Sequence, residues 1–188
     1  MEMNSRLYGN ASLGKSIRTV QVLDGRWRFL LDPEDRHLET PPASSAYADE
    51  IRVPGSWEEQ GFGSPPAGSA IDTWTKTLEY EGAAWYSLEF ALEESAGQTA
   101  DDSEGQAEER VAERAGGRGN VGVRRRLVIA GARWTTALWV NGRPIGEEDS
   151  LSVEHVYDVT EAIAAGTNRI DIRVDNRMRL PLAESHIH

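Results

Sequence analysis

The chain has 188 residues, enough for one domain with a hydrophobic core, and carries 31 acidic against 20 basic residues, a net charge of −11. This balance argues against nucleic acid and anionic membrane surfaces as partners, since both attract clustered basic residues. There is no cysteine, which excludes disulfides and thiolate metal sites.

The first residues are polar and lack the apolar stretch of a secretory signal. No run approaches the roughly eighteen apolar residues of a membrane span. We therefore expect a cytoplasmic protein with no membrane partner. Residues 1–16 are expected to form a polar segment that precedes the folded domain.

Alternating residues mark the first predicted strands. Trp27, Phe29 and Leu31 share one face of a segment whose other face carries Arg26 and Arg28. Such alternation is typical of an antiparallel sheet with one wet face. A short strand then ends at 53–55, Val-Pro-Gly, and a loop rich in Gly, Pro and Ser follows over 56–71, of a length typical of functional loops.

The same period predicts strands over 73–80 and 84–92, the second with Tyr86, Leu88 and Phe90 on one face. Residues 93–119 hold eight acidic residues and three arginines and no aromatic residue. A segment of this composition buries too little apolar area to offset its ordering entropy. It predicts a disordered acidic insertion between two strands.

Shorter apolar runs predict buried strands at 127–130 and 138–140, and alternation predicts another at 170–175. Asn141-Gly142 predicts a type I′ turn in a hairpin. Thr160 is expected to cap a helical turn over 161–165, which Gly166 would end. Eight or so strands with almost no helix indicate an all-β sandwich or barrel.

Several short motifs occur in a recognisable order along the chain. They are LDGRWRF (23–29), VPGSW (53–57), YEGAAWY (80–86), ALWVNG (137–142), Gly146, HVYDVT (155–160), GTN (166–168) and VDN (174–176). The series resembles the N-terminal sugar-binding domain of glycoside hydrolase family 2, which includes β-galactosidases and β-glucuronidases, over roughly residues 20–188 apart from the acidic insertion.

The resemblance implies a jelly-roll β-sandwich of the galactose-binding-domain type over 17–180, with 181–188 starting a linker. It further implies a downstream immunoglobulin-like sandwich and a (β/α)8 barrel, which carries the two catalytic glutamates of a retaining hydrolysis. Neither glutamate has a matching position here, so we assign no catalytic residue, metal or cofactor to this chain. A β-glycoside would be the parent's substrate, and the parent enzyme could be a homo-oligomer.

Six tryptophans are candidates for contact because sugars stack on aromatic faces. Trp27 and Trp139 lie among apolar strand residues and are expected in the core. Trp85 points opposite to Tyr86, so one of these two faces must be covered, in the intact family by a neighbouring domain. Trp57, near the start of the long loop, and Trp74, after it, are the best candidates for ligand or interdomain contact, although the usual burial of tryptophan favours core or interface packing over sugar stacking. The role of Trp134 stays open.

Three polar residues, Asp175, Asn176 and Arg177, end the last predicted strand. They could read sugar hydroxyls, or Asp175 and Arg177 could pair while Asn176 closes a turn. His155 is expected to hold a bend by a hydrogen bond. His186 is a further candidate contact, near a chain end that is expected to fray.

Three functions compete. The motif order favours a non-catalytic sugar-binding domain of a family 2 β-glycosidase, which would buttress the barrel and the rim of its substrate pocket. It predicts an uncovered apolar patch near Trp85 or Trp57. A free-standing carbohydrate-binding module, or a sandwich for protein association, are the alternatives. Glu147, Glu148 and Asp149 form an acidic cluster, which we interpret as solvated charges at a hairpin edge.

Overall fold

The computed structural model describes residues 4–11, 17–66, 77–92 and 124–177. These residues form two short 3-10 turns, η1 (Ser44–Ala46) and η2 (Glu58–Gln60), and ten strands. The strands are β1 (Asn4–Ala11), β2 (Ile17–Val22), β3 (Gly25–Asp32), β4 (Asp49–Val53), β5 (Ala83–Ala91), β6 (Arg124–Ala130), β7 (Thr135–Val140), β8 (Arg143–Asp149), β9 (His155–Asp158) and β10 (Thr167–Asp175).

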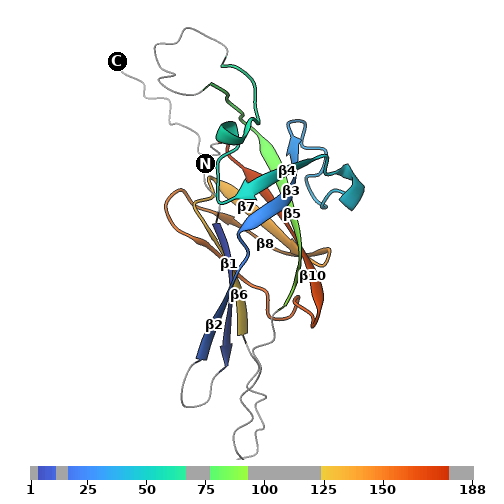
Figure 1. The fold of residues 1–188 in the computed structure, drawn as a ribbon, viewed down its shortest axis with the longest axis vertical. Coiled ribbons are helices and arrows are strands. Elements are labelled where there is room, and N and C mark those ends of the chain that lie inside the picture. Colours follow the sequence, from blue (N-terminus) through green and yellow to red (C-terminus); the bar gives the residue numbers. More distant parts are fainter. Residues whose placement is uncertain (1–3, 12–16, 67–76, 93–123, 178–188) are drawn as a thin grey trace, which may run out of the picture.

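The strands build two antiparallel sheets that pack face to face (Figure 1). The smaller sheet has the order β2-β1-β6-β9, and the larger has the order β4-β3-β5-β10-β7-β8. The chain crosses repeatedly from one sheet to the other, so that neighbours such as β5 and β10 are distant in sequence. The fold is a jelly-roll β-sandwich, and the predicted fold class is confirmed.

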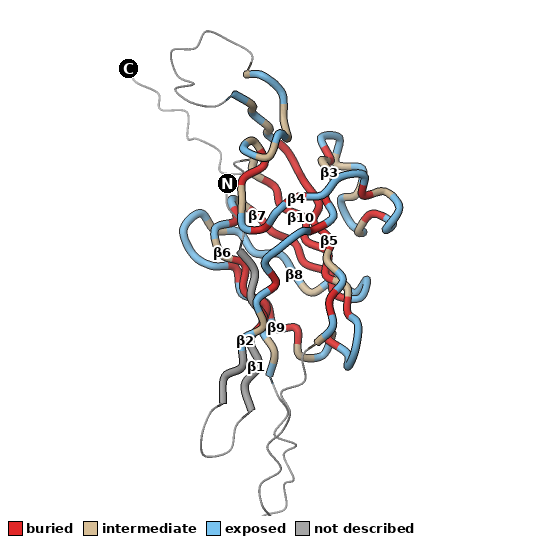
Figure 2. Tube along the Cα trace, in the orientation of Figure 1, coloured by how far each residue is buried: buried red, intermediate tan, exposed pale blue. Residues whose placement is uncertain are grey.

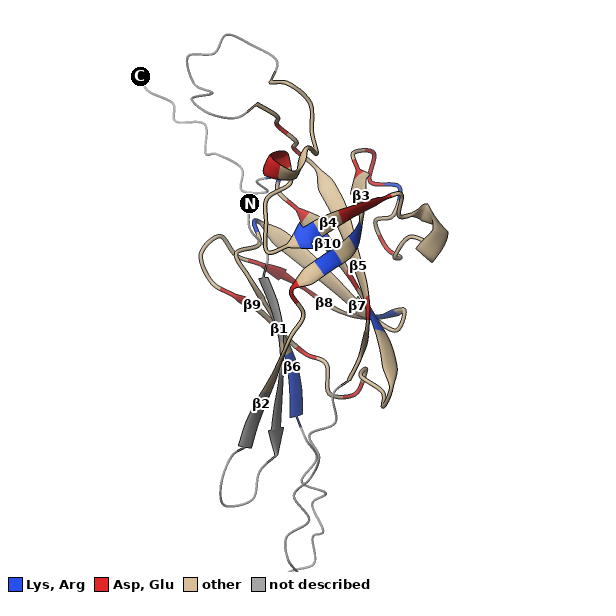
Figure 3. Cartoon of the chain, in the orientation of Figure 1, with Lys and Arg blue, Asp and Glu red and all other residues tan. Residues whose placement is uncertain are grey.

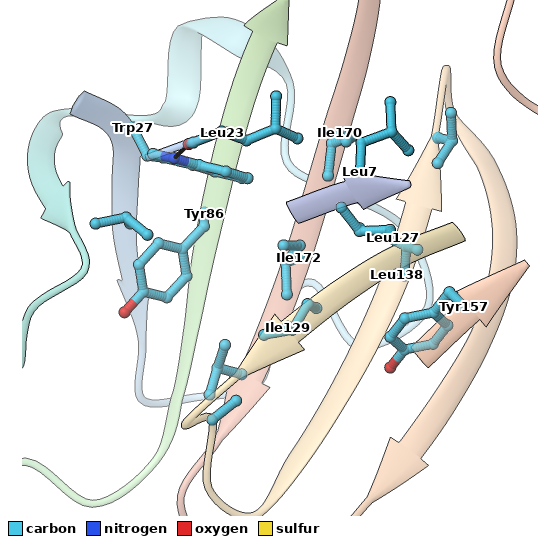
Figure 4. Close-up of a cluster of buried hydrophobic side chains, with 14 of the residues drawn as sticks. Leu7, Leu23, Trp27, Tyr86, Leu127, Ile129, Leu138, Tyr157, Ile170 and Ile172 are labelled. Atoms are coloured by element: carbon cyan, nitrogen blue, oxygen red, sulfur yellow. Dashed lines mark hydrogen bonds between the residues drawn. The ribbon is translucent and has the colours of Figure 1, made fainter. Parts of the chain in front are cut away.

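The core lies between the two sheets (Figures 2 and 4). Trp27 and Tyr86 extend into it from the larger sheet, and Leu127 and Ile129 face them from the smaller one. Ile172, at the centre of β10, has no exposed surface. Burying side chains of this size contributes about 1.5–3 kcal/mol each, which favours the apolar residues that β3, β5 and β10 direct into the core.

The sandwich begins earlier in the chain than the sequence indicated. β1 lies within the segment expected to precede the domain, yet it pairs with β2 on one side and with β6 on the other. Its Leu7 is buried in the core. Pairing with β6 joins residues about 120 positions apart, and no local pattern in a polar segment reveals such a partner.

The predicted hairpin turn is confirmed. Asn141 and Gly142 have φ angles of 52° and 78° between β7 and β8, as a type I′ turn requires. A single helical turn forms two residues earlier than the predicted 161–165, since the N–H groups of Ala162 and Ile163 both donate to the Val159 carbonyl, and Gly166 has the expected positive φ of 84°. The Thr160 hydroxyl accepts a hydrogen bond from the Arg125 backbone N–H on β6 and therefore does not cap a helix.

The predicted strand at 73–80 is described only from residue 77, and residues 77–80 form no strand. A single bridge joins Ser64 to Glu79. The predicted insertion at 93–119, Trp74, His186 and the predicted linker lie outside the described residues. In the part that is described, neither of the short helical turns has the length or the apolar character to cross a bilayer.

Candidate functional site

Trp57 is a core residue rather than a contact platform. Its indole is fully buried, and its Nε1 donates a hydrogen bond to the Tyr86 hydroxyl. The ring packs edge-on against Tyr80 at 5.5 Å between centroids and obliquely against Phe29 at 6.4 Å. Trp57 therefore ties the loop after β4 to the sandwich core.

Trp85 is covered by the chain's own connection between β3 and β4, residues 33–48. It lies on the outer face of the larger sheet against Trp139, with ring centroids 5.0 Å apart. Tyr47 from the connection packs over this pair and donates a hydrogen bond of 2.9 Å to Asp171 on β10. The predicted uncovered apolar patch at Trp85 or Trp57 is thus wrong, because both side chains are 0% exposed.

Arginines of β10 hold this connection in place. Arg169 donates hydrogen bonds to the Ser44 hydroxyl and the Pro42 carbonyl on the connection, and pairs with the buried Asp171 at 2.7 Å. Arg173, itself buried, pairs with Asp35 at the start of the connection. Figure 3 shows the resulting mixture of acidic and basic segments around β3, β4 and β10.

A cluster of four ion-paired side chains, which we call the clasp, consists of Asp35, Arg173, Asp175 and Arg177. Arg177 makes most of the hydrogen bonds of the clasp. Its guanidinium donates to both carboxylate oxygens of Asp175 at 2.9 and 2.7 Å and to both of Asp35 at 2.8 Å. Burial disfavours the charged form of Asp175, but hydrogen bonds from Arg177 outweigh it and hold the pKa of Asp175 below its ordinary value. Hydrogen bonds from Arg177 are the main cause of the lowered pKa of Asp35.

Asn176 fastens the end of β10 to the segment before β5. Its Oδ1 accepts a hydrogen bond from the Gly82 N–H at 2.7 Å, and its Nδ2 donates to the Tyr80 carbonyl at 2.6 Å. The sequence left two readings open for 175–177, and in this structure all three side chains bind within the protein. Their use for sugar hydroxyls stays a prediction.

One end of the sandwich carries a hollow of about 850 Å³, which we call the loop-end hollow. Asn176 lies at its edge, η2 borders it on one side, and the connections after β6 and after β8 border it on the others. The lining residues are Ser56, Glu58, Glu59, Thr77, Gly131, Ala132, Arg133, Trp134, Leu151, Ser152, Val153, Glu154 and Asn176.

Trp134 is the aromatic residue of the loop-end hollow, and its backbone is fixed from both sides. Its N–H donates to the Asp175 carbonyl at 2.8 Å, and its own carbonyl accepts from the Ser150 N–H at 3.1 Å. The side chain is half-buried. The sequence did not single out Trp134, since its exposure depends on three loops meeting at this end; the preceding Gly131 was the only local sign of a loop.

His155 has a structural role that links the two sheets. Its ring is buried, with Nδ1 2.5 Å from the Thr136 hydroxyl and Nε2 3.3 Å from the Ser150 carbonyl. Tyr157 donates to the Thr136 carbonyl at 2.7 Å. The predicted hydrogen bond of His155 is present, but it secures the loop after β8 rather than the bend at Thr160.

Acidic residues do not gather into a metal site in the described part of the chain, where no group of three or more His, Asp or Glu side chains could hold an ion. Glu147, Glu148 and Asp149 lie exposed on β8, an edge strand of the larger sheet, as predicted. The chemistry that the loop-end hollow offers is noncovalent: an aromatic ring, carboxylates, a guanidinium and hydroxyls.

No protein-family model and no curated protein matches the chain in sequence. Solved structures do match its fold. A Lactobacillus rhamnosus β-glucuronidase gives a TM-score of 0.55 at 22% identity, over 88% of this chain and 22% of that one. An uncultured Clostridium β-glucuronidase gives 0.53 at 18% identity, over 88% and 24%.

A glycosyl hydrolase family 2 member from Bacteroides cellulosilyticus gives a TM-score of 0.52 at 17% identity, over 95% of this chain and 18% of that one. The chain shares its fold with one part of these glycosidases. It spans only about a fifth of their length. At such identities the likeness concerns the fold, which agrees with the resemblance seen in the motifs.

Proposed function

We propose that this chain is a non-catalytic, N-terminal sugar-binding domain of a family 2 β-glycosidase. The proposal is carried by the extent of the structural alignments, which span most of this chain but only about a fifth of each glycosidase. In such a parent, the sandwich would support the catalytic barrel and contribute to the rim of its substrate pocket.

The rigidity of the loop end supports this role. Trp134, Asn176 and the loop after β8 are each fixed by backbone hydrogen bonds, so the surface is formed before any partner binds. A preformed surface loses little conformational entropy on association. The loop-end hollow is therefore the surface that we assign to contact with substrate or catalytic domain.

Two measurements test the proposal. Sequencing the coding DNA downstream of codon 188 should show the reading frame continuing into a second sandwich and a (β/α)8 repeat with two strand-end glutamates. The purified 188-residue chain should not hydrolyse nitrophenyl β-glycosides. Turnover that copurifies with the chain through several columns would overturn the non-catalytic role.

The half-buried Trp134 beside polar side chains favours one alternative, a free-standing carbohydrate-binding module. A stop codon directly after codon 188, together with saturable binding of a hexose, would favour that alternative. A reading frame that continues beyond codon 188 would favour the non-catalytic domain of a larger glycosidase.

A further inference from the structure

The described part of the sandwich has four edge strands, β2 and β9 on the smaller sheet and β4 and β8 on the larger. An unprotected edge strand presents a row of backbone donors and acceptors to any strand that approaches it. Natural sheets protect such edges with charged residues, proline, bulges, very short strands or a covering loop. Three of the four edges of this sandwich have at least one of these features.

The two edges of the larger sheet are protected by different means. On β4, the side chain of Gln60 from η2 accepts a hydrogen bond from the Arg52 N–H at 2.7 Å and donates one to the Arg52 carbonyl at 3.0 Å. On β8, Pro144 lacks a backbone donor, a register shift interrupts the pairing with β7, and the acidic residues 147–149 are exposed. An approaching strand would meet occupied backbone groups at β4 and negative charge at β8.

The two edges of the smaller sheet differ from each other. β9 has only four residues and ends at the exposed Asp158. β2 has six residues, with no proline and a single charged residue, Arg18. It pairs with β1 on one side, and no described strand lies on its other side (Figure 1). β2 is therefore the least protected edge among the described strands.

Exposed apolar side chains accompany this open edge. Val20 and Val22 on β2 are 45% and 56% exposed. Among the described strand residues, Val156 on β9 is the one other large apolar residue that is exposed. The strand registers place Val22 and Val156 in one row across the sheet, so both lie on its outer face. At the β2 edge, two exposed valines thus lie next to a backbone that has no neighbouring strand among those described.

We propose that β2 pairs antiparallel with β2 of a second copy of this chain. A twofold axis perpendicular to the sheet makes the contact isologous, so that one edge serves as both donor and acceptor surface. The two four-stranded sheets then join into one continuous sheet whose outer faces lie on the same side. Val20 and Val22 of one copy lie beside the same residues of the other, and cross-strand pairs of β-branched residues stabilise a sheet. This inference goes beyond the proposed function and does not depend on it.

The length of β2 limits the strength of the dimer. Six residues of strand extend over about 20 Å, so the shared edge is much smaller than a standard interface of about 1,600 Å². We therefore expect a weak dimer that dissociates reversibly on dilution.

Sedimentation equilibrium of the full 188-residue chain, between about 10 µM and about 1 mM, tests the pairing. The weight-average mass should rise with concentration from 20.8 kDa towards twice that value. Val20→Lys should weaken the association about tenfold or more, because symmetry places two ammonium groups side by side where apolar residues met. If circular dichroism shows that Val20→Lys does not fold, Val22→Lys takes its place.

Val156→Lys is the matched control, since Val156 has nearly the same exposure, 42%, on the same face at the opposite edge. It should associate as the wild type does, and the backbone amides of β2, but not those of β9, should exchange more slowly with deuterium at the higher concentration. Equal loss of association in both variants would mean that the outer faces stack, and would overturn the edge pairing. Unchanged association of Val20→Lys would overturn it as well. A wild type that stays monomeric would exclude the second copy and leave a strand of another protein as the occupant.

Discussion

Replacing Asp175 by Asn tests whether the clasp stabilises the fold. The Asp175 side chain is 2% exposed and accepts hydrogen bonds from Arg177 and Arg173, the latter only 3% exposed. Asparagine keeps the shape but loses the charge, and its NH2 group must face guanidinium donors. Arg173 would retain Asp35, whose side chain is 29% exposed, as its carboxylate partner.

Removing one partner of a buried ion pair lowers the free energy of unfolding by about 3–5 kcal/mol. Because asparagine still offers one acceptor oxygen and Asp35 remains, we expect the lower end, a loss of about 3 kcal/mol in the free energy of unfolding. A chain of this length shifts its Tm by about 2–4 °C per kcal/mol. Asp175→Asn should therefore lower Tm by roughly 6–12 °C.

Thermal and urea unfolding, followed by tryptophan fluorescence, measure this loss. Asp24→Asn is the control, since Asp24 is exposed, and its free energy of unfolding should change by less than about 0.5 kcal/mol. A Tm for Asp175→Asn within 2 °C of the control would refute the stabilising role of the clasp. If Asp175→Asn does not fold, Asp35→Asn provides the same comparison at a more exposed member.

The free energy of unfolding should also depend on pH through the clasp carboxylates Asp35 and Asp175. The pKa values of Asp35 and Asp175 lie below the ordinary 3.8 in the folded chain, so their contribution is complete above about pH 3.8. It is lost as the pH falls through the lowered values, because the unfolded carboxylates take up protons first. The free energy of unfolding should fall more steeply below pH 4 in the wild type than in Asp175→Asn.

Two further substitution pairs have opposite expected outcomes in the same unfolding assays. Thr135→Val should be neutral or raise stability by up to about 1 kcal/mol, because the buried Thr135 hydroxyl has no hydrogen-bond partner among the described residues. Thr136→Val should lower the free energy of unfolding by about 1–3 kcal/mol, since the Thr136 hydroxyl has two buried hydrogen-bond partners, His155 and Tyr157. Equal changes in stability for the two threonine variants would contradict this expectation. Gly142→Ala should cost about 1 kcal/mol because φ is 78° there, whereas Gly146→Ala, with an ordinary φ and a neighbour at 3.9 Å, should not.

The sequence alone was sufficient to predict the features that depend on near neighbours. Alternation located β3, β5 and β10, and the Asn141-Gly142 pair located the hairpin, because side-chain direction and turn angles are fixed within a few residues. The motif order then predicted the sandwich class. Residues 73–80 show the limit of alternation, since their described part forms no strand.

The site depended on contacts between segments far apart in the chain. The sequence showed that the outer face of Trp85 needed a cover, but only the tertiary structure showed that residues 33–48 supply it, through Tyr47 and the arginines of β10. Trp57 was a candidate for ligand or interdomain contact with core packing as the competing role, and in the structure its indole donates a hydrogen bond to the Tyr86 hydroxyl inside the core. Trp134 came to line the loop-end hollow for the same reason. Whether a side chain is buried depends on which distant segments of the chain pack together, and no local sequence pattern specifies that packing.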